Sequence, residues 1–502
     1  MSPDSTDLKP PLEQGPRTPS LATTAARGAL IMLTGQGMRV VFQFASVVIL
    51  ARLLTPHDYG LIAIVAVIIG IGEIFRDFGL SSAAVRAPDL TRGQSTNLFW
   101  INTSIGIVLG AALFGLAGPI ALAFRQPEVV GVARAMAAIF VLNGLATQLR
   151  ALVVRALKFR WLAAFEVIAP ATALAVAICA AMLGWNYWSL VAQQITQALV
   201  LLIGAALGAR FLPGMPKSDE SVRSLISLGG NLVLSQVINY VTNKIDTAAV
   251  GFFYGATPLG MYNRAFQLVG MPLTQIQAPI TSVAIPILSK LQEDQKRFSA
   301  YIVRGQLALG YPIAIGLTMA AVAAHPIIEL MLGQQWLAAV PLLQFFALAG
   351  IAKTLASVGY WVYVVRGLGA SLFRFTAATA VIPVACVIVG SQWGVVGIAG
   401  GFALAPCLNW PLSLLWLSRA TEVPTKALYV GALRIIFVAV STGAGSYFSL
   451  IVAPPMSALA SITLAGAAAL ISLGLLCVIP RIRADVVSLW ELTALVRRRR
   501  SA

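Results

Sequence analysis

The sequence is poor in charged residues, and in acidic residues most of all. Only 11% of its 502 residues are charged, and 18 Asp and Glu stand against 35 Lys and Arg. Soluble domains carry about a quarter of their residues as charges. With 58% hydrophobic residues, a chain of this length cannot hide its apolar surface in a soluble core. We therefore expect an all-α polytopic membrane protein.

Histidine and cysteine are also scarce. His57 and His325 have no metal-ligand spacing, and the four cysteines all lie in apolar segments. Such cysteines are more typical of small core residues than of disulfides or metal ligands. No glycine-rich phosphate loop follows a strand, so a built-in ATPase is not expected. The sequence therefore predicts no metal, no cofactor and no enzyme activity.

The net charge of +17 raises the question of nucleic acid. The basic residues are spaced singly between apolar blocks, and no basic patch with interleaved aromatic residues is present to form a nucleic-acid footprint. Single basic residues beside apolar blocks are typical of cytoplasmic loops next to lipid. We therefore expect the phospholipid bilayer, and no nucleic acid, as a partner.

About fourteen apolar blocks are long enough to cross the hydrocarbon layer. The predicted spans are 28–53, 59–79, 95–123, 128–152, 162–184, 187–209, 226–253, 258–286, 300–324, 337–365, 369–390, 393–417, 427–450 and 457–479. Placing both termini in the cytoplasm puts most of the 35 Lys and Arg on the cytoplasmic side, as the positive-inside rule requires.

Two stretches of the chain look like copies of one unit. Residues 35–60 form an apolar helix that ends in a breaker containing Pro56 and Gly60, and residues 231–262 repeat this with Pro258 and Gly260. Six helices separate the copies, so both have the same orientation and form a parallel repeat. The expected organisation is a disordered cytoplasmic tail (1–25), an N-terminal six-helix lobe (26–209), a cytoplasmic linker (210–225), a C-terminal six-helix lobe (226–417), two additional helices (427–479) and a basic cytoplasmic tail (480–502).

Charged residues inside predicted helices are costly, so each should face a partner or a wet cavity. Arg39 is central in the first helix and shares a polar stripe with Gln36, Gln43 and Ser46. Asn239 and Asp246 belong to a matching stripe in the seventh helix. The two stripes would face each other across a shared cleft. The alternative is that such amides and hydroxyls join neighbouring helices.

Further buried charges are Arg264, Lys353 and Glu73. The excess of cations suits an anionic ligand, above all a phosphate. Tyr360 shares a helix face with Lys353 and could stack on a sugar ring, although most such aromatics belong to the interfacial belt. Glu73 and Asp246 are candidates for ion coupling, and each could instead pair with a neighbouring basic residue.

Three short segments resemble a known family. They are residues 51–60 (ARLLTPHDYG), 75–86 (FRDFGLSSAAVR) and 255–260 (GATPLG). They look like bacterial polysaccharide flippases, the Wzx-like lipopolysaccharide and exopolysaccharide exporters of the MOP (multidrug, oligosaccharidyl-lipid, polysaccharide) superfamily. The similarity covers the first twelve helices and extends toward all fourteen.

The resemblance implies two six-helix lobes in a V around a central cationic cavity, in a bacterial inner membrane. The cargo would be an undecaprenyl-diphosphate-linked oligosaccharide, flipped from the cytoplasmic to the periplasmic leaflet by alternating access. Lipid II flippases of the superfamily use arginines on helices one and eight, which Arg39 and Arg264 match by helix. A polysaccharide polymerase and a chain-length regulator are candidate partners.

The leading hypothesis places the diphosphate on Arg39, with help from Lys353 or Arg264, and the sugars along the polar stripes. A drug or metabolite exporter of the same superfamily is the second hypothesis, and it requires acidic residues in the cavity. The third is a membrane polymerase or glycosyltransferase, which would need an acidic residue in an outward loop; the candidates are Asp58, Glu128 and Glu329.

Overall fold

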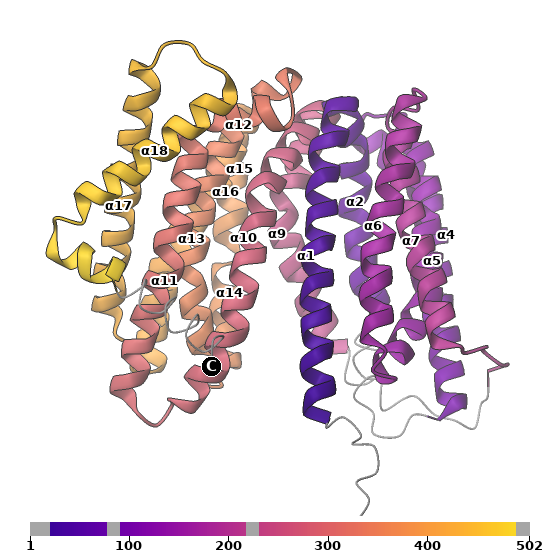
Figure 1. The fold of residues 1–502 in the computed structure, drawn as a ribbon. Helices are drawn as coiled ribbons and strands as arrows, with labels where there is room; N and C mark the ends of the chain where they lie inside the picture. Colours follow the sequence, from indigo (N-terminus) through magenta and orange to yellow (C-terminus); the bar gives the residue numbers. More distant parts are fainter. Residues whose placement is uncertain (1–20, 78–90, 217–229, 488–502) are drawn as a thin grey trace, which may run out of the picture.

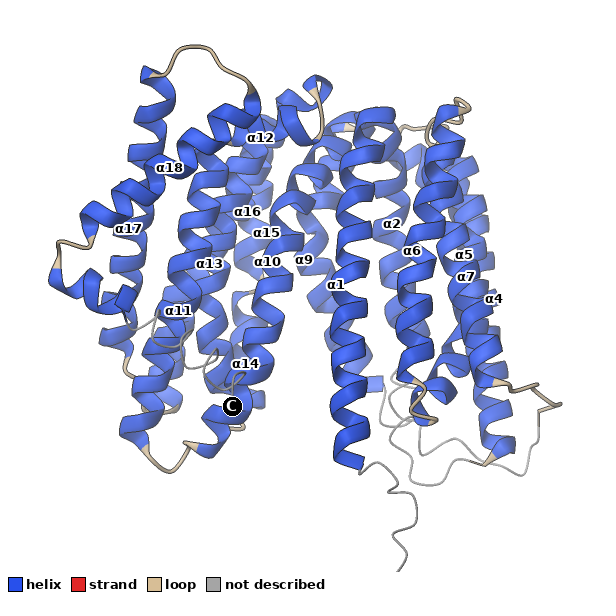
Figure 2. Cartoon of the chain, viewed as in Figure 1, coloured by secondary structure: helices blue, strands red, loops and turns tan. Residues whose placement is uncertain are grey.

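The computed structural model describes residues 21–77, 91–216 and 230–487, and side chains within α1 from Thr34 onward. Figure 2 shows that these ranges consist of helices and connecting loops, and no strand occurs in them. The all-α fold expected from the composition is therefore confirmed.

The N-terminal lobe contains six long helices, at the right of Figure 1. They are α1 (Leu21–Leu53), α2 (Pro56–Asp77), α4 (Arg92–Phe124), α5 (Val129–Arg155), α6 (Phe159–Met182) and α7 (Trp188–Ala209). α1 packs on α6, while α5 packs on both α4 and α7. α1 ends at the top of Figure 1, which is called the upper end below, and the opposite end is the lower end.

The C-terminal lobe repeats this pattern with more interruptions. Its elements are α9 (Gly230–Tyr254), α10 (Ala256–Lys290), α11 (Gln295–Val322), α12 (Ala324–Met331), the 3₁₀ turn η1 (Gln334–Ala339), α13 (Val340–Val365), α14 (Gly369–Thr379), α15 (Val381–Gly390), the 3₁₀ turn η2 (Ser391–Trp393) and α16 (Gly394–Ala420). α13 packs against α16, α11 and α10.

Two further helices, α17 (Thr425–Val452) and α18 (Ala458–Leu476), stand outside both lobes. α17 packs on α11. Residues 480–487 form one more helical segment, in which Ile482 and Asp485 are buried. Ile482 belongs to an apolar cluster with side chains of α11 and α17. The C-terminal segment is thus fastened to the outer face of the C-terminal lobe.

Twelve stretches among the described residues are long and apolar enough to cross a membrane. One of them, Gly369–Ala420, contains α14 and α15 followed by α16, and therefore two passes. α9 is not among the twelve, but it runs alongside them between the same two ends (Figure 1). Counting the long stretch twice and adding α9 gives the fourteen passes expected from the sequence.

The breaker after α1 is a helix N-terminus with a capping arrangement. Asp58 accepts hydrogen bonds from the backbone N–H of Thr55 at 2.8 Å and from its hydroxyl at 2.7 Å. The Thr55 hydroxyl in turn accepts from the Asp58 N–H at 3.3 Å. Pro56 occupies the first helical position, where its missing N–H costs nothing. The Asp58 side chain therefore takes part in capping the N-terminus of α2.

The two lobes meet at the upper end through α2, which packs on α10 and α9. Leu61 of α2 and Leu259 of α10 belong to one apolar cluster that spans both lobes. His57 and Thr257, at the start of α2 and α10, approach to 3.4 Å between Nδ1 and Oγ1. Toward the lower end the ribbons of α1 and α10 diverge (Figure 1). Among the described residues, the two lobes contact each other around the upper end and along α2, where the Tyr240 hydroxyl of α9 donates to the Val67 carbonyl at 3.2 Å.

Some expected boundaries were wrong. α1 begins at Leu21, so residues 21–25 are helical and do not belong to a tail. The span expected at 369–390 is divided at Ala380 into α14 and α15. Residues 325–336, expected to be a connection, lie within α12 and η1 and the turn between them, and the basic tail expected from residue 480 starts as a helix. The linker expected at 210–225 lies outside the described residues beyond Pro216.

Candidate substrate cavity between the lobes

A cavity of about 220 Å³ lies between the two lobes. Its walls come from α2 and α7 of the N-terminal lobe and from α9 and α10 of the C-terminal lobe. The lining residues are Tyr59, Ile62, Ala63, Ala66, Val67, Gln194, Tyr240, Lys244, Thr247, Asn263, Arg264 and Gln267. Two of these described residues are cationic and none is acidic. The described lining of the cavity thus combines two basic side chains with three amide side chains.

Arg264 is held in the cavity by groups from both lobes. Its guanidinium carbon lies 3.6 Å from the ring centroid of Tyr59, close enough for a cation–π contact. Its Nη1 donates to Gln267 Oε1 at 2.8 Å, while its buried Nε has no hydrogen-bond partner among the described residues. Burying a donor without a partner costs free energy. An anion placed there would supply the missing acceptor.

Lys244 and Asp246 are two residues apart on α9 and do not form an ion pair. Asp246 is buried and accepts a hydrogen bond from the Tyr262 hydroxyl at 2.7 Å. Lys244 lies 5.5 Å from the ring centroid of Phe266. Residues spaced by two on a helix do not face each other. The Asp246 carboxylate is therefore turned into the C-terminal lobe, and the lysine charge is left to the cavity.

The polar stripe expected on α1 does not line the cavity that contains Arg264. Ser46 accepts a hydrogen bond from Gln193 of α7 at 2.7 Å. Gln36, Arg39 and Gln43 are partly buried and do not line the cavity between the lobes. Arg39 makes no hydrogen bond or ion pair with the part of the chain that the structure describes. The Asn239 side chain lies outside the described residues.

Lys353 and Tyr360 line a separate cavity inside the C-terminal lobe, of about 250 Å³. The Lys353 Nζ lies 4.3 Å from the ring centroid of Phe402. Tyr360 is 48% exposed and contributes to the same wall. The structure thus brings Lys353 and Tyr360 together, and separates both from the cavity that holds Arg264.

Glu73 is bound on both carboxylate oxygens near the lower end of α2. Arg76 donates to Oε2 through Nε at 2.7 Å and forms an ion pair with the same oxygen. Asn143 of α5 donates to Oε1 at 2.8 Å. Arg76 also donates to the Asn143 carbonyl and the Thr147 hydroxyl. Glu73 is thus paired with a neighbouring basic residue.

The sequence did not single out the segment that links the lobes at the upper end. Trp336 Nε1 of η1 donates to the carbonyl of Ala51 at 2.8 Å, and Gln335 donates to the carbonyls of Ala51 and Leu54 at 2.9 and 3.2 Å. These are the carbonyls that the end of a helix leaves unpaired. Trp336 also packs edge-on to Tyr59, with ring centroids 5.5 Å apart.

The fold is that of an all-α polytopic membrane protein. The family profile of polysaccharide biosynthesis proteins matches residues 49–341, which is more than half of the chain. The chain therefore belongs to this family.

Two relatives support the same assignment. The chain is 24% identical over 419 residues to the lipopolysaccharide biosynthesis protein WzxC of Escherichia coli K12, covering 82% of each chain. It is 27% identical over 352 residues to the succinoglycan biosynthesis transport protein ExoT of Rhizobium meliloti, covering 70% of this chain and 71% of that protein. Both relatives are thus named for polysaccharide biosynthesis, in agreement with the family of this chain.

Solved structures share the fold. The lipid II flippase MurJ in an inward closed conformation superimposes with a TM-score of 0.66, at 15% identity, over 89% of this chain and 99% of that one. An inward-facing multidrug resistance MATE family transporter of the MOP superfamily gives a TM-score of 0.55 at 14% identity, over 82% and 98%. The chain therefore shares the fold of these two proteins.

Proposed function

We propose that this protein moves an undecaprenyl-diphosphate-linked oligosaccharide repeat unit from the cytoplasmic to the periplasmic leaflet by alternating access, for exopolysaccharide or lipopolysaccharide synthesis. The relatives are a lipopolysaccharide biosynthesis protein and a succinoglycan transport protein, and a lipid II flippase shares the fold. A polysaccharide polymerase and a chain-length regulator would act next on the delivered repeat unit.

The observation that carries this proposal is the charge of the cavity between the lobes. Arg264 and Lys244 line it, and no carboxylate does so among the described residues. A diphosphate is a strong multidentate acceptor that matches a guanidinium and an ammonium group. A drug exporter that accepts cations would need acidic residues at this place, so the anionic cargo fits better.

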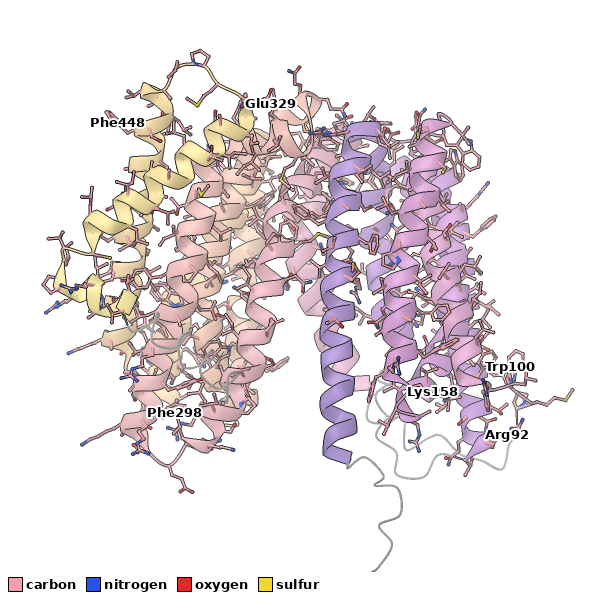
Figure 3. All side chains as sticks on the ribbon, viewed as in Figure 1. Arg92, Trp100, Lys158, Phe298, Glu329 and Phe448 are labelled. Atoms are coloured by element: carbon pink, nitrogen blue, oxygen red, sulfur yellow. The ribbon has the colours of Figure 1, made fainter. Side chains whose placement is uncertain are left out.

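We assign the lower end to the cytoplasm. Figure 3 places Arg92 and Lys158 at the lower end and Glu329 at the upper end, as the positive-inside rule requires. α1 starts at the lower end, which is consistent with a cytoplasmic N-terminus. In this conformation the contact between the lobes lies on the periplasmic side, so the cavity would receive its cargo from the cytoplasmic side.

Arg39 would then meet the diphosphate before Arg264. At 1.5 Å per residue, Arg39 lies about 21 Å below the upper end of α1, whereas Arg264 lies about 12 Å below the start of α10. The two arginines therefore differ by roughly 9 Å in depth along the helix axes. We assign Arg39 to the entry of the head group and Arg264 with Lys244 to the deeper position.

Ion coupling would use Glu73 or Asp246. Glu73 forms an ion pair with Arg76, and Asp246 accepts a hydrogen bond from the Tyr262 hydroxyl. Protonation or sodium binding would alter these contacts within one lobe. Export by Glu73→Gln and Asp246→Asn variants, measured with and without a proton gradient, distinguishes the coupling residue from a purely structural one.

The test of the proposed function is export by arginine variants of the full chain. Arg39→Ala should abolish polysaccharide export while membrane insertion stays normal, and Arg39→Lys should restore part of it, because lysine keeps the charge and loses the planar fork. Arg125→Ala, at the upper end of α4, is the matched control and should export normally. Normal export by a well-inserted Arg39→Ala protein contradicts the proposal.

A further inference from the structure

The cavity within the C-terminal lobe is chemically distinct from the one between the lobes. It lies among α9, α13, α14 and α16, and it shares no lining residue with the cavity that holds Arg264. α9 separates the two, since Lys244 lines one and Thr242 and Asn243 line the other. The mechanism proposed above leaves the cavity around Lys353 without a role.

The lining of this cavity combines one cation with groups that suit a sugar. Lys353 supplies the charge, Tyr360 and Phe402 supply aromatic faces, and Asn409 and Ser413 supply polar atoms. No acidic residue is among the described residues of its wall.

Asn409 adds an independent observation. Its Oδ1 is buried and has no hydrogen-bond partner among the described residues, although the residue lines the cavity. A buried amide oxygen without a donor is costly, so the position favours a ligand that donates a hydrogen bond. A bare anion cannot donate one, whereas a sugar hydroxyl can. A ligand that carries both a carboxylate and hydroxyls satisfies Lys353 and Asn409 together.

The N-terminal lobe has a cavity at the corresponding position, and the basic residues that line it form ion pairs. A cavity of about 230 Å³ lies between the fourth, fifth and sixth helices of that lobe, as the Lys353 cavity does in its own lobe. There, Arg150 forms an ion pair with Glu166, and Arg76 forms one with Glu73. The two cavities are therefore related by the repeat, but only the C-terminal one keeps a cation without an acidic partner in its wall.

We propose that the C-terminal-lobe cavity is a subsite for an acidic sugar of the cargo, with Lys353 binding the carboxylate and Asn409 accepting a hydrogen bond from a sugar hydroxyl. This inference rests on the proposed function, because it assigns the sugar part of the same lipid-linked cargo. It makes the protein selective for repeat units that contain a uronic acid or another carboxylated sugar, while the diphosphate remains with the cavity between the lobes.

The test is isothermal titration of the full chain in detergent with two disaccharides of similar size, acidic digalacturonate and neutral lactose. We expect digalacturonate to bind at least tenfold more tightly than lactose. Lys353→Gln should remove this preference, and Lys353→Arg should retain it. Arg150→Gln, in the equivalent cavity of the other lobe, is the matched control and should leave the preference unchanged. Asn409→Ala should weaken binding of both sugars.

Separate measurements keep this inference distinct from the proposed function. Binding of farnesyl diphosphate should depend on Arg264 and remain unchanged in Lys353→Gln. If the chain binds farnesyl diphosphate and exports polysaccharide but shows no preference for digalacturonate, the acidic-sugar subsite is wrong and the flippase assignment stands. Binding of phosphatidylglycerol that depends on Lys353, without binding of digalacturonate, would assign the cavity to a lipid head group and overturn the proposal.

Discussion

Gly60 of α2 packs against α10, and Gly260 of α10 packs against α2, across the interface between the lobes. A Cβ on Gly60 would overlap the carbonyl oxygen of Ala256, and a Cβ on Gly260 would overlap the carbonyl oxygen of Pro56. The contact is reciprocal, since the first turn of α2 packs into the first turn of α10 and vice versa. Only residues without a side chain allow two helices to approach this closely. The two copies of the repeat thus form the upper contact through the same pair of positions.

We predict that Gly60→Ala prevents the lobes from closing at the upper end. The added methyl group meets backbone atoms, which cannot move aside as a flexible side chain could. Polysaccharide export should fall to the level of the deletion strain. A cysteine introduced at Ala63, which lines the cavity between the lobes, should react faster with a membrane-impermeant thiol reagent added from the periplasm.

Gly115→Ala in α4 is the matched control, because nothing lies within 4 Å of a Cβ at that position. Replacing a glycine within a helix by alanine otherwise stabilises the helix by roughly 1 kcal/mol. The control should therefore export normally and show unchanged labelling at position 63. Equal export by Gly60→Ala and Gly115→Ala would show that the close approach is not required for transport.

A disulfide between positions 57 and 257 should lock the transporter. The side chains of His57 and Thr257 are 3.4 Å apart across the lobe interface. With the four native cysteines replaced, the double variant His57→Cys, Thr257→Cys should cross-link on mild oxidation and lose export. Reduction should restore export, and neither single cysteine should respond to oxidant. Full export by the cross-linked protein would mean that the upper contact does not open during transport.

Arg264 should tolerate lysine better than glutamine. Lysine keeps the charge but loses the planar fork that contacts Tyr59 and Gln267. A charge-assisted hydrogen bond contributes about 2 kcal/mol, or roughly thirtyfold in affinity. Binding of farnesyl diphosphate should therefore weaken by roughly that factor in Arg264→Lys, and further in Arg264→Gln. Unchanged binding of farnesyl diphosphate by Arg264→Gln would show that Arg264 does not bind the diphosphate.

The helical segment 480–487 should depend on Asp485 for its attachment to α11 and α17. Asp485 Oδ2 accepts from Arg434 Nη1 at 2.6 Å and from the Tyr311 hydroxyl at 3.0 Å. Asp485→Asn leaves a partly buried arginine without its counter-ion, which should lower the free energy of unfolding by about 3 kcal/mol. Titration with a denaturing detergent measures this change.

The control for that experiment is Arg297→Gln. Arg297 pairs with Asp294, but its side chain is 79% exposed, so its loss should change stability by less than about 1 kcal/mol. The double variant Arg434→Leu, Asp485→Leu should recover most of the stability lost in Asp485→Asn, because it leaves no unpaired charge. Equal losses in the single and double variants would contradict the ion-pair explanation.

Periodicity and composition were sufficient to predict the architecture. Hydrophobic length defines membrane passes, and the repeated breakers at Pro56 and Pro258 revealed the two lobes. The sequence also placed Arg264 and Lys353 among the buried cations. It could not show that they occupy different cavities, because the separation depends on α9, which contributes Lys244 to one cavity and Thr242 and Asn243 to the other, and this is a tertiary relationship.

Other features have no local signature. Residues 325–336 resemble an ordinary connection in the sequence, and the role of Trp336 in binding the end of α1 depends on a partner far away in the chain. The sequence analysis did not place Lys244 in the site, although Lys244 lines the cavity between the lobes and Asp246 lies two residues away. Their spacing of two residues turns the side chains apart, and the Tyr262 hydroxyl binds the carboxylate instead.

The most direct test of the whole account is the leaflet in which lipid-linked oligosaccharide accumulates when the gene is deleted. A membrane-impermeant sugar-cleaving enzyme, added to intact spheroplasts, reports which repeat units are exposed on the periplasmic side. We predict that repeat units accumulate in the cytoplasmic leaflet and become cleavable only after the membrane is opened. Repeat units that reach the periplasmic leaflet at a normal rate and remain unpolymerised would show that the protein acts after flipping, which contradicts the account.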